Sequence, residues 1–133
     1  MANAIFDDKP GGRMTDAEVR NYLQENGYPE HVVRGGRAGL LRRWREFVAE
    51  VENGYSLHLE DYRNDLDLRA IIRLTGLEAE AADADARFEK MLTARHIRVW
   101  ESAPGDPFWD FGYPKNAGPD LIADLKSEGL IAP

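Results

Sequence analysis

The spacing of apolar residues along the chain predicts a protein built mostly of helices. The clearest stretch is Gly39–Asn53, where apolar residues recur every three or four positions, as they do on one face of a helix. Asn53 and Gly54 then supply a helix stop signal. We expect this helix to be the centre of the core. The side chains that we expect to pack together and be almost fully buried are Trp44, Phe47, Val51 and Leu66.

Capping residues, glycines and prolines delimit the other predicted helices. Thr15 and Glu18 form a capping-box pattern, in which both side chains bond to the first free amides of a helix that ends at Gly27. The remaining helices are predicted from Pro29 to Val33, from Leu59 to Leu74, from Leu77 to about Ala94, and from Gly118 to Gly129. The stretch from Leu59 is either one helix or two helices broken near Asp65.

The pattern changes to alternation after His96, which predicts an antiparallel β-hairpin. Ala103-Pro104-Gly105-Asp106 has the sequence of a β-turn. Counting outwards from this turn places Trp100 opposite Trp109 and His96 opposite Tyr113, and side chains alternate between the two faces. One face then holds His96, Arg98, Trp100, Trp109, Phe111 and Tyr113, and the other holds Ile97, Val99, Glu101, Phe108 and Asp110.

This hairpin has two interpretations, because apolar residues lie on both of its faces. In the first, the aromatic face covers the helical core, and Ile97, Val99 and Phe108 form an exposed patch for a second subunit or another partner. In the second, the aromatic face is open to a ligand, and Arg98 stacks on one of its rings. The unpaired hairpin edges are a further route to a homodimer.

Together these patterns predict an α+β fold: a mainly helical, bundle-like domain of five or six helices with one C-terminal antiparallel β-hairpin. Pro10, Gly11 and Gly12 interrupt regular structure near the start. We therefore expect a flexible arm over residues 1–13 and a single globular domain over residues 14–133. A length of 133 residues, with 43% hydrophobic and 31% charged residues, suits one folded domain.

Composition excludes several classes of site. The chain has no cysteine, so it has no disulfide, no thiolate metal site and no cysteine nucleophile. It has no apolar run of about 18 residues, which argues against a membrane span. The first residues lack the basic and apolar regions of a secretory signal, and we therefore expect a cytoplasmic protein.

Charge is divided unevenly along the chain. With 17 basic and 24 acidic residues the net charge is −7, which argues against nucleic-acid binding by the surface as a whole. Residues 30–45 nevertheless contain five arginines and one acid, whereas residues 46–67 contain seven acids and one arginine. Such segregation can steer a charged partner, or it can be only a solvated face.

The acidic part contains the first candidate site. Glu60, Asp61, Asn64 and Asp65 fall on one helical face. They could bind a partner protein, or, with His58 just upstream, give oxygen and nitrogen ligands to a divalent cation. The spacing is not that of an EF-hand, and an acidic helix face is usually only solvated.

The basic part contains the second candidate site. Gly35, Gly36 and Gly39 precede a helix and lie among arginines, which loosely resembles an anion-binding loop of backbone amides. The arginines that would assist are Arg34, Arg37 and Arg42. The loop lacks a preceding strand and the P-loop lysine, and a simple turn between helices explains it equally.

The function that these features favour is a non-enzymatic, acidic protein-interaction module, such as a small bacterial-type adaptor or immunity-like protein. We expect another protein as its partner, including a second copy through the hairpin, and no cofactor, metal or catalytic residue. The alternative is a small-ligand or divalent-metal-dependent enzyme that uses the Glu60–Asp65 cluster. A deep apolar pocket with converging polar groups would favour the enzyme, and a flat negative face the module.

Overall fold

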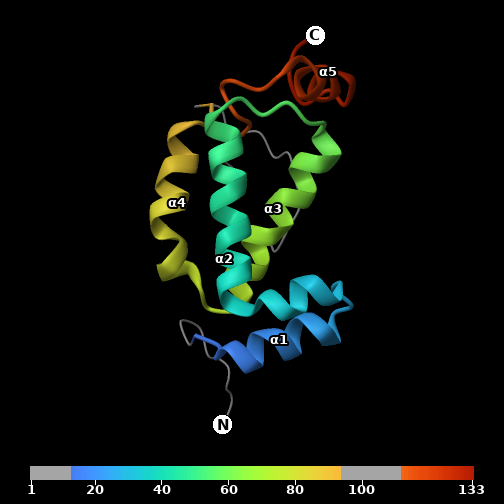
Figure 1. The fold of residues 1–133 in the computed structure, drawn as a ribbon. Helices are drawn as coiled ribbons and strands as arrows, with labels where there is room; N and C mark the ends of the chain where they lie inside the picture. Colours follow the sequence, from blue (N-terminus) through green and yellow to red (C-terminus); the bar gives the residue numbers. More distant parts are fainter. Residues whose placement is uncertain (1–12, 94–111) are drawn as a thin grey trace.

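The computed structural model describes residues 13–93 and 112–133 of the chain. Figure 1 shows the helices that these residues form. They are α1 (Asp16–Glu25), α2 (Glu30–Glu52), α3 (Leu59–Leu74), α4 (Glu78–Lys90) and α5 (Pro119–Ser127). Of the two alternatives for the third helix, a single uninterrupted helix is the correct one.

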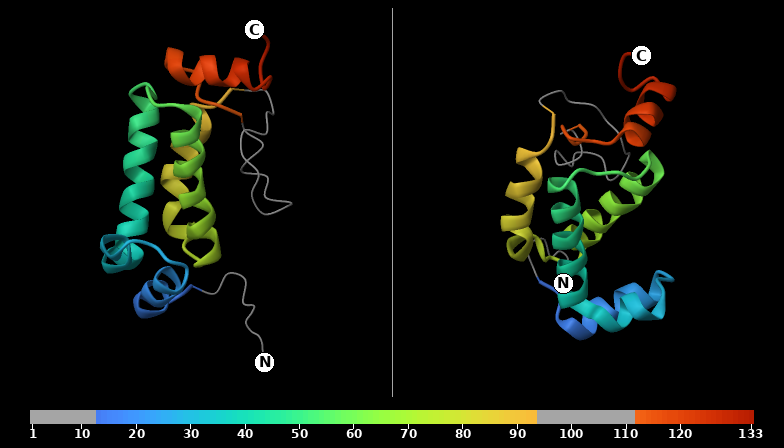
Figure 2. Two further views of the ribbon diagram at one scale, coloured as in Figure 1. Left: turned by 90° about the vertical axis from the view of Figure 1, so that its right-hand side faces the viewer. Right: turned by 45° about the horizontal axis from the view of Figure 1, so that its top comes forward.

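Three helices form the body of the fold, and one helix lies across each end. The long part of α2 packs against both α3 and α4, and these two also contact each other. At one end α1 packs on the first turns of α2, and at the other α5 packs on α3 (Figures 1 and 2). None of the helices in the described ranges is long and apolar enough to cross a bilayer.

The predicted capping box at the start of α1 is confirmed. The Thr15 hydroxyl accepts the Glu18 amide proton, and the Glu18 carboxylate accepts the Thr15 amide proton at 2.8 Å. The predicted interruption near Gly36 is also present, as a kink within α2. Gly36 has φ +57° and ψ −147°, which is not helical, and α2 changes direction at this residue (Figure 1).

Asp16 holds α1 to this bend. Its Oδ1 atom accepts the backbone N–H of Arg37 at 3.0 Å, and its Oδ2 atom lies 2.8 Å from Nε of Arg20. A Cβ atom on Gly36 would overlap Oδ1 of Asp16. The glycine is therefore required both by its positive φ angle and by the close approach of this carboxylate.

We expect Gly36→Ala to lower the free energy of unfolding by about 1–3 kcal/mol, because the new side chain is strained at this φ angle and displaces Asp16. Gly35→Ala is the matched control, since Gly35 has no positive φ angle and open space at its Cβ position. Alanine in a helix is better than glycine by about 0.5–1 kcal/mol, so the control is expected to be neutral or stabilising. Urea unfolding of both variants measures this difference, and equal effects would contradict the role of the bend.

The core lies where the central-helix prediction placed it. Trp44, Phe47, Val51 and Leu66 are all buried, which confirms that part of the prediction. The Trp44 and Phe47 rings lie 5.2 Å apart between centroids, and each lies 5.4 Å from Phe88 of α4. Tyr55 and Tyr62 extend the cluster from Phe47, with centroids 5.8 and 6.1 Å from its ring. These aromatic contacts join α2, α3 and α4.

A buried ion pair joins the same three helices. Arg69 of α3, with a side chain only 6% exposed, donates two hydrogen bonds to Asp85 of α4, at 2.9 and 2.8 Å. It donates a third to Glu78 at 3.0 Å. The indole N–H of Trp44 donates to the same Asp85 at 2.9 Å. Burial alone would lower the pKa of Arg69, but its bonds to Asp85 and Glu78 raise that pKa above the usual value.

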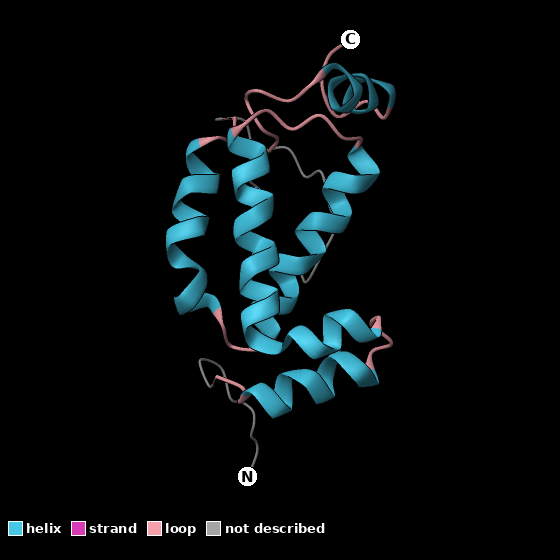
Figure 3. Ribbon diagram, in the orientation of Figure 1, coloured by secondary structure: helices cyan, strands magenta, loops and turns pink. Residues whose placement is uncertain are grey.

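The predicted α+β class is wrong, because the described residues form helices and contain no strand (Figure 3). Most of the predicted hairpin, His96–Phe111, lies outside the described residues. The chain does meet itself just beside it, through an isolated antiparallel bridge between Leu92 and Pro114. The register counted from the turn, with Trp100 opposite Trp109, concerns pairs that lie outside the described residues. Alternation is a local pattern, and it led to a strand-containing class that the described part of the chain does not show.

Candidate functional site

The acidic residues predicted to share one face point to different partners. Glu60 is exposed, and Asp61 accepts the backbone N–H of His58 at 3.2 Å, which caps the start of α3. Asp65 is half-buried and accepts the hydroxyl proton of Tyr55 at 2.9 Å. Within residues 13–93 and 112–133 no group of three or more acidic or histidine residues could hold a metal ion.

His58, the histidine beside this cluster, connects α3 to α5. Its Nδ1 atom and the Leu59 backbone N–H lie 2.9 and 3.1 Å from Oδ2 of Asp124. The hydrogen bond to Asp124 is the main cause that raises the pKa of His58. The bonds from Leu59 and His58 lower the pKa of Asp124. These contacts dock α5 on the first turn of α3 and give His58 a structural role.

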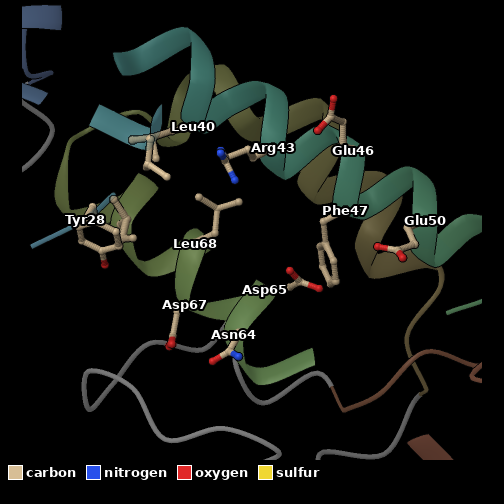
Figure 4. A pocket seen from close by; sticks show the side chains of 12 residues that line it. Tyr28, Leu40, Arg43, Glu46, Phe47, Glu50, Asn64, Asp65, Asp67 and Leu68 are labelled. Carbon is tan, nitrogen blue, oxygen red and sulfur yellow. The ribbon is translucent and has the colours of Figure 1, made fainter. Parts of the chain in front are cut away.

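A pocket of about 490 Å³ lies between α2 and α3 (Figure 4). We call it the α2–α3 pocket. Its apolar and aromatic lining comes from Tyr28, Val32, Leu40, Phe47, Leu68 and Ile71, and its polar lining from Arg43, Glu46, Glu50, Asn64, Asp65 and Asp67. Two of the predicted partner-binding residues, Asn64 and Asp65, therefore belong to it, and Glu60 and Asp61 do not.

Helical spacing explains why these side chains meet. On α2, Leu40, Arg43, Phe47 and Glu50 are three, four and three residues apart, so they follow one face of the helix. On α3, Asn64, Leu68 and Ile71 are four and three residues apart and form the opposite wall. The pocket thus combines one face of each helix, and its lining residues are up to 43 positions apart in sequence, from Tyr28 to Ile71.

Asp65 is the carboxyl group whose environment is most unusual. In Figure 4 its oxygens point towards the ring of Phe47. Burial raises the pKa of Asp65 to about 6, and the negative charges of Glu50 and Asp61 add to this rise, although the Tyr55 hydrogen bond opposes it. Burial and the same carboxylate also raise the pKa of Tyr55, which therefore stays protonated and remains the donor.

Arg43 is the positive group of the pocket. Its guanidinium group points into the space between Leu40 and Leu68 (Figure 4). The side chain is half-buried, yet within the described part of the chain it forms no salt bridge or hydrogen bond. Glu46 instead lies 4.0 Å from Arg42, on the neighbouring face of α2. Asn64 and Asp67 point away from α2 and lie at the rim.

The three arginines of the predicted anion loop each lie beside an acid. Arg34 lies 3.4 Å from Glu30, Arg37 lies 3.0 Å from Glu80, and Arg42 lies beside Glu46. The backbone amide that the loop offers, that of Arg37, already binds the Asp16 carboxylate. An added anion would have to compete with these partners, and the anion site stays an untested prediction.

Some predicted site residues lie outside the described part of the chain, and some residues of the pocket were not predicted. Ile97, Val99 and Phe108, the predicted hairpin patch, lie outside the described residues. Arg43, Glu46 and Glu50 of the pocket were not predicted as site residues. A signal for them existed, because they recur at three and four positions beside the apolar stripe of α2.

Comparison of the chain with protein-family models, with curated proteins and with solved structures finds no match.

Proposed function

We propose that this protein is a non-catalytic binding module, of the adaptor or immunity-like kind, that takes a short segment of a partner protein in the α2–α3 pocket. The observation that carries the proposal is the pocket itself, at about 490 Å³ and lined half by apolar and half by polar side chains. Pockets that bind ligands are typically about 300–1,000 Å³. This space holds a few side chains of a partner.

The charge of the pocket indicates the kind of segment. Among the described residues, four carboxylates line it, from Glu46, Glu50, Asp65 and Asp67, against one guanidinium group, that of Arg43. Most of these acids are exposed and form a rim, while Leu40, Phe47 and Ile71 form an apolar floor. A segment with apolar side chains and at least one basic residue is complementary to this surface. The proposed compartment is the cytoplasm, since a chain without cysteine needs no oxidising environment.

Selection from a random peptide library displayed on phage tests the proposal directly. We expect the enriched peptides to contain lysine or arginine beside apolar residues, because these satisfy the rim and the floor together. Their affinities, measured by fluorescence anisotropy, are expected to fall roughly tenfold or more in Glu50→Lys, which reverses one charge in the pocket.

Glu60→Lys is the matched control, because Glu60 is exposed on α3 and does not line the pocket. It makes the same charge change, so it should alter affinity only weakly, through the long-range field. Enriched peptides without basic residues, or peptides equally sensitive to both variants, would refute the assignment of the pocket.

A small-ligand enzyme is the second candidate, and one observation favours it. Asp65, with a pKa of about 6, is suited to accept or donate a proton near neutral pH inside a pocket. A small-molecule screen by thermal shift can reverse the ranking. A saturable rise in melting temperature that disappears in Asp65→Asn would place this candidate first.

A further inference from the structure

The α2–α3 pocket has charges of opposite sign at its two ends. Arg43 and Glu50 both line it from α2 and are seven residues apart, which corresponds to about 10 Å along a helix axis. Asp65 lies on the Glu50 side of Arg43 in Figure 4. Figure 4 shows Asp65 next to Phe47 and Arg43 between Leu40 and Leu68.

The positive end lacks an anion. A half-buried guanidinium without an acceptor loses hydration and gains no hydrogen bond in return, which is unfavourable. Arg43 forms no hydrogen bond or ion pair with residues 13–93 and 112–133. The planar fork of an arginine matches a carboxylate with two parallel hydrogen bonds. A carboxylate on a bound segment would therefore satisfy this group.

The negative end lacks a cation. Asp65 uses one oxygen to accept from Tyr55, which is a neutral donor, and no basic side chain of the described residues pairs with Asp65 or Glu50. Two neighbouring carboxylates repel each other, and burial adds to the cost of ionising Asp65. An ammonium group placed between them would offset both effects.

We propose that the α2–α3 pocket recognises two opposite charges on one partner segment: a carboxylate at Arg43, and a lysine ammonium at Asp65 and Glu50. Apolar side chains of the segment lie between the charges, over Phe47 and Leu68. In a segment of polyproline II conformation, three residues span about 9 Å and side chains three positions apart share one face, so the two charged residues are three positions apart. This inference rests on the proposed function and specifies the partner of the same site.

Short peptides of defined sequence test the two contacts separately. The probes are acetylated, amidated tetrapeptides with the sequences Lys-Leu-Leu-Glu and Glu-Leu-Leu-Lys, which cover both chain directions. In one neutral form glutamine replaces glutamate, and in the other norleucine replaces lysine. We expect one of the two directions to bind, and each neutral form of it to bind roughly tenfold more weakly, as measured by NMR titration.

Variants of the pocket assign each contact to its end. In Arg43→Gln, the peptide with glutamate and the peptide with glutamine should bind with equal affinity. The peptide with norleucine in place of lysine should still bind more weakly. In Glu50→Gln the pattern should be the reverse. Arg43→Lys should keep part of the preference for the carboxylate, since it keeps the charge but not the fork. Circular dichroism and melting temperatures confirm that each variant is folded.

Two results would overturn this inference: tetrapeptides that bind without regard to one of their charges, or penalties that stay unchanged in both variants. These results differ from a failure of the proposed function. Phage-selected peptides that depend on Glu50 but carry no acidic residue would leave the binding function in place and refute only the two-charge recognition. Selected peptides that bind elsewhere would refute the proposed function itself.

Discussion

Replacing Asp85 with alanine is expected to lower the free energy of unfolding by about 3–5 kcal/mol, because it leaves a buried charge without its main partner. The Arg69 side chain is 6% exposed and has two of its hydrogen bonds with Asp85. The indole N–H of Trp44 loses its acceptor in the same variant. Glu78, another partner of Arg69, is 51% exposed and cannot take over both bonds.

Glu78→Gln is the matched control for this loss. It removes the charge of the exposed partner and keeps the shape of the side chain, so we expect a cost of about 1 kcal/mol or less. A second comparison separates the destabilisation caused by an unpaired buried charge from the net contribution of the intact ion pair to stability. The double variant Arg69→Met with Asp85→Leu is expected to recover most of the loss, since apolar pairs often replace buried ion pairs at little cost.

Urea unfolding followed by circular dichroism measures all three variants. The role assigned to the ion pair would be wrong if Asp85→Ala and Glu78→Gln had similar effects. It would also be wrong if the double variant were no more stable than Asp85→Ala, since the cost would then come from lost packing or from the Trp44 donor.

The helices were predictable because their signals are local. The capping box at Thr15, the stop at Gly54 and the apolar spacing of α2 all lie within a few turns of the residues that they organise. The buried ion pair had a local signal too. Arg69 follows Tyr62 and Leu66 at helical spacing, and Asp85 falls between Ala81 and Phe88 in the same way. A charged residue inside an apolar stripe is a signal for a buried ion pair, although the pattern does not identify its partner, and we did not predict this pair from the sequence.

The hairpin was not predictable in the same way. Alternation over some 18 residues, with a turn sequence in the middle, is the usual signal for two paired strands. The observed bridge pairs Leu92 with Pro114, and the Thr93 amide donates to the Tyr113 carbonyl at 2.9 Å. This bridge joins the end of α4 to the segment before α5, so it depends on where those helices place the chain, whereas the pairs counted from the turn lie outside the described residues.

Part of the candidate site could be predicted from the sequence, because some of its residues form a local cluster. The acids of α3 stood out as a local cluster, and Asn64 and Asp65 do line the pocket. Arg43 and Glu50 become pocket residues only because α2 packs against α3, which brings the two helix faces together. The tyrosine that binds Asp65 comes from the loop between these helices. Sequence spacing within one helix contains no information on such a partner.

Trp44→Ala is expected to cost about 3–5 kcal/mol, as a fully buried aromatic side chain is removed from the centre of the core. Its ring contacts Phe47 and Phe88 and holds α2 against α4. For a domain of this size the corresponding fall in melting temperature is roughly 10 °C or more. Thermal unfolding followed by circular dichroism measures it, and a melting temperature within a few degrees of the wild type would refute the central role of α2.

Trp44→Phe separates packing from hydrogen bonding at the same position. Phenylalanine keeps an aromatic ring between Phe47 and Phe88 but lacks the indole N–H that donates to Asp85. A hydrogen bond to a charged group contributes about 1.5–3 kcal/mol, and Asp85 still pairs with Arg69, so we expect a loss near the lower end of that range. Peptide binding should also persist in Trp44→Phe, because Trp44 does not line the α2–α3 pocket. If Trp44→Phe instead costs as much as Trp44→Ala, the Trp44–Asp85 bond, rather than the aromatic packing, holds α2 in place.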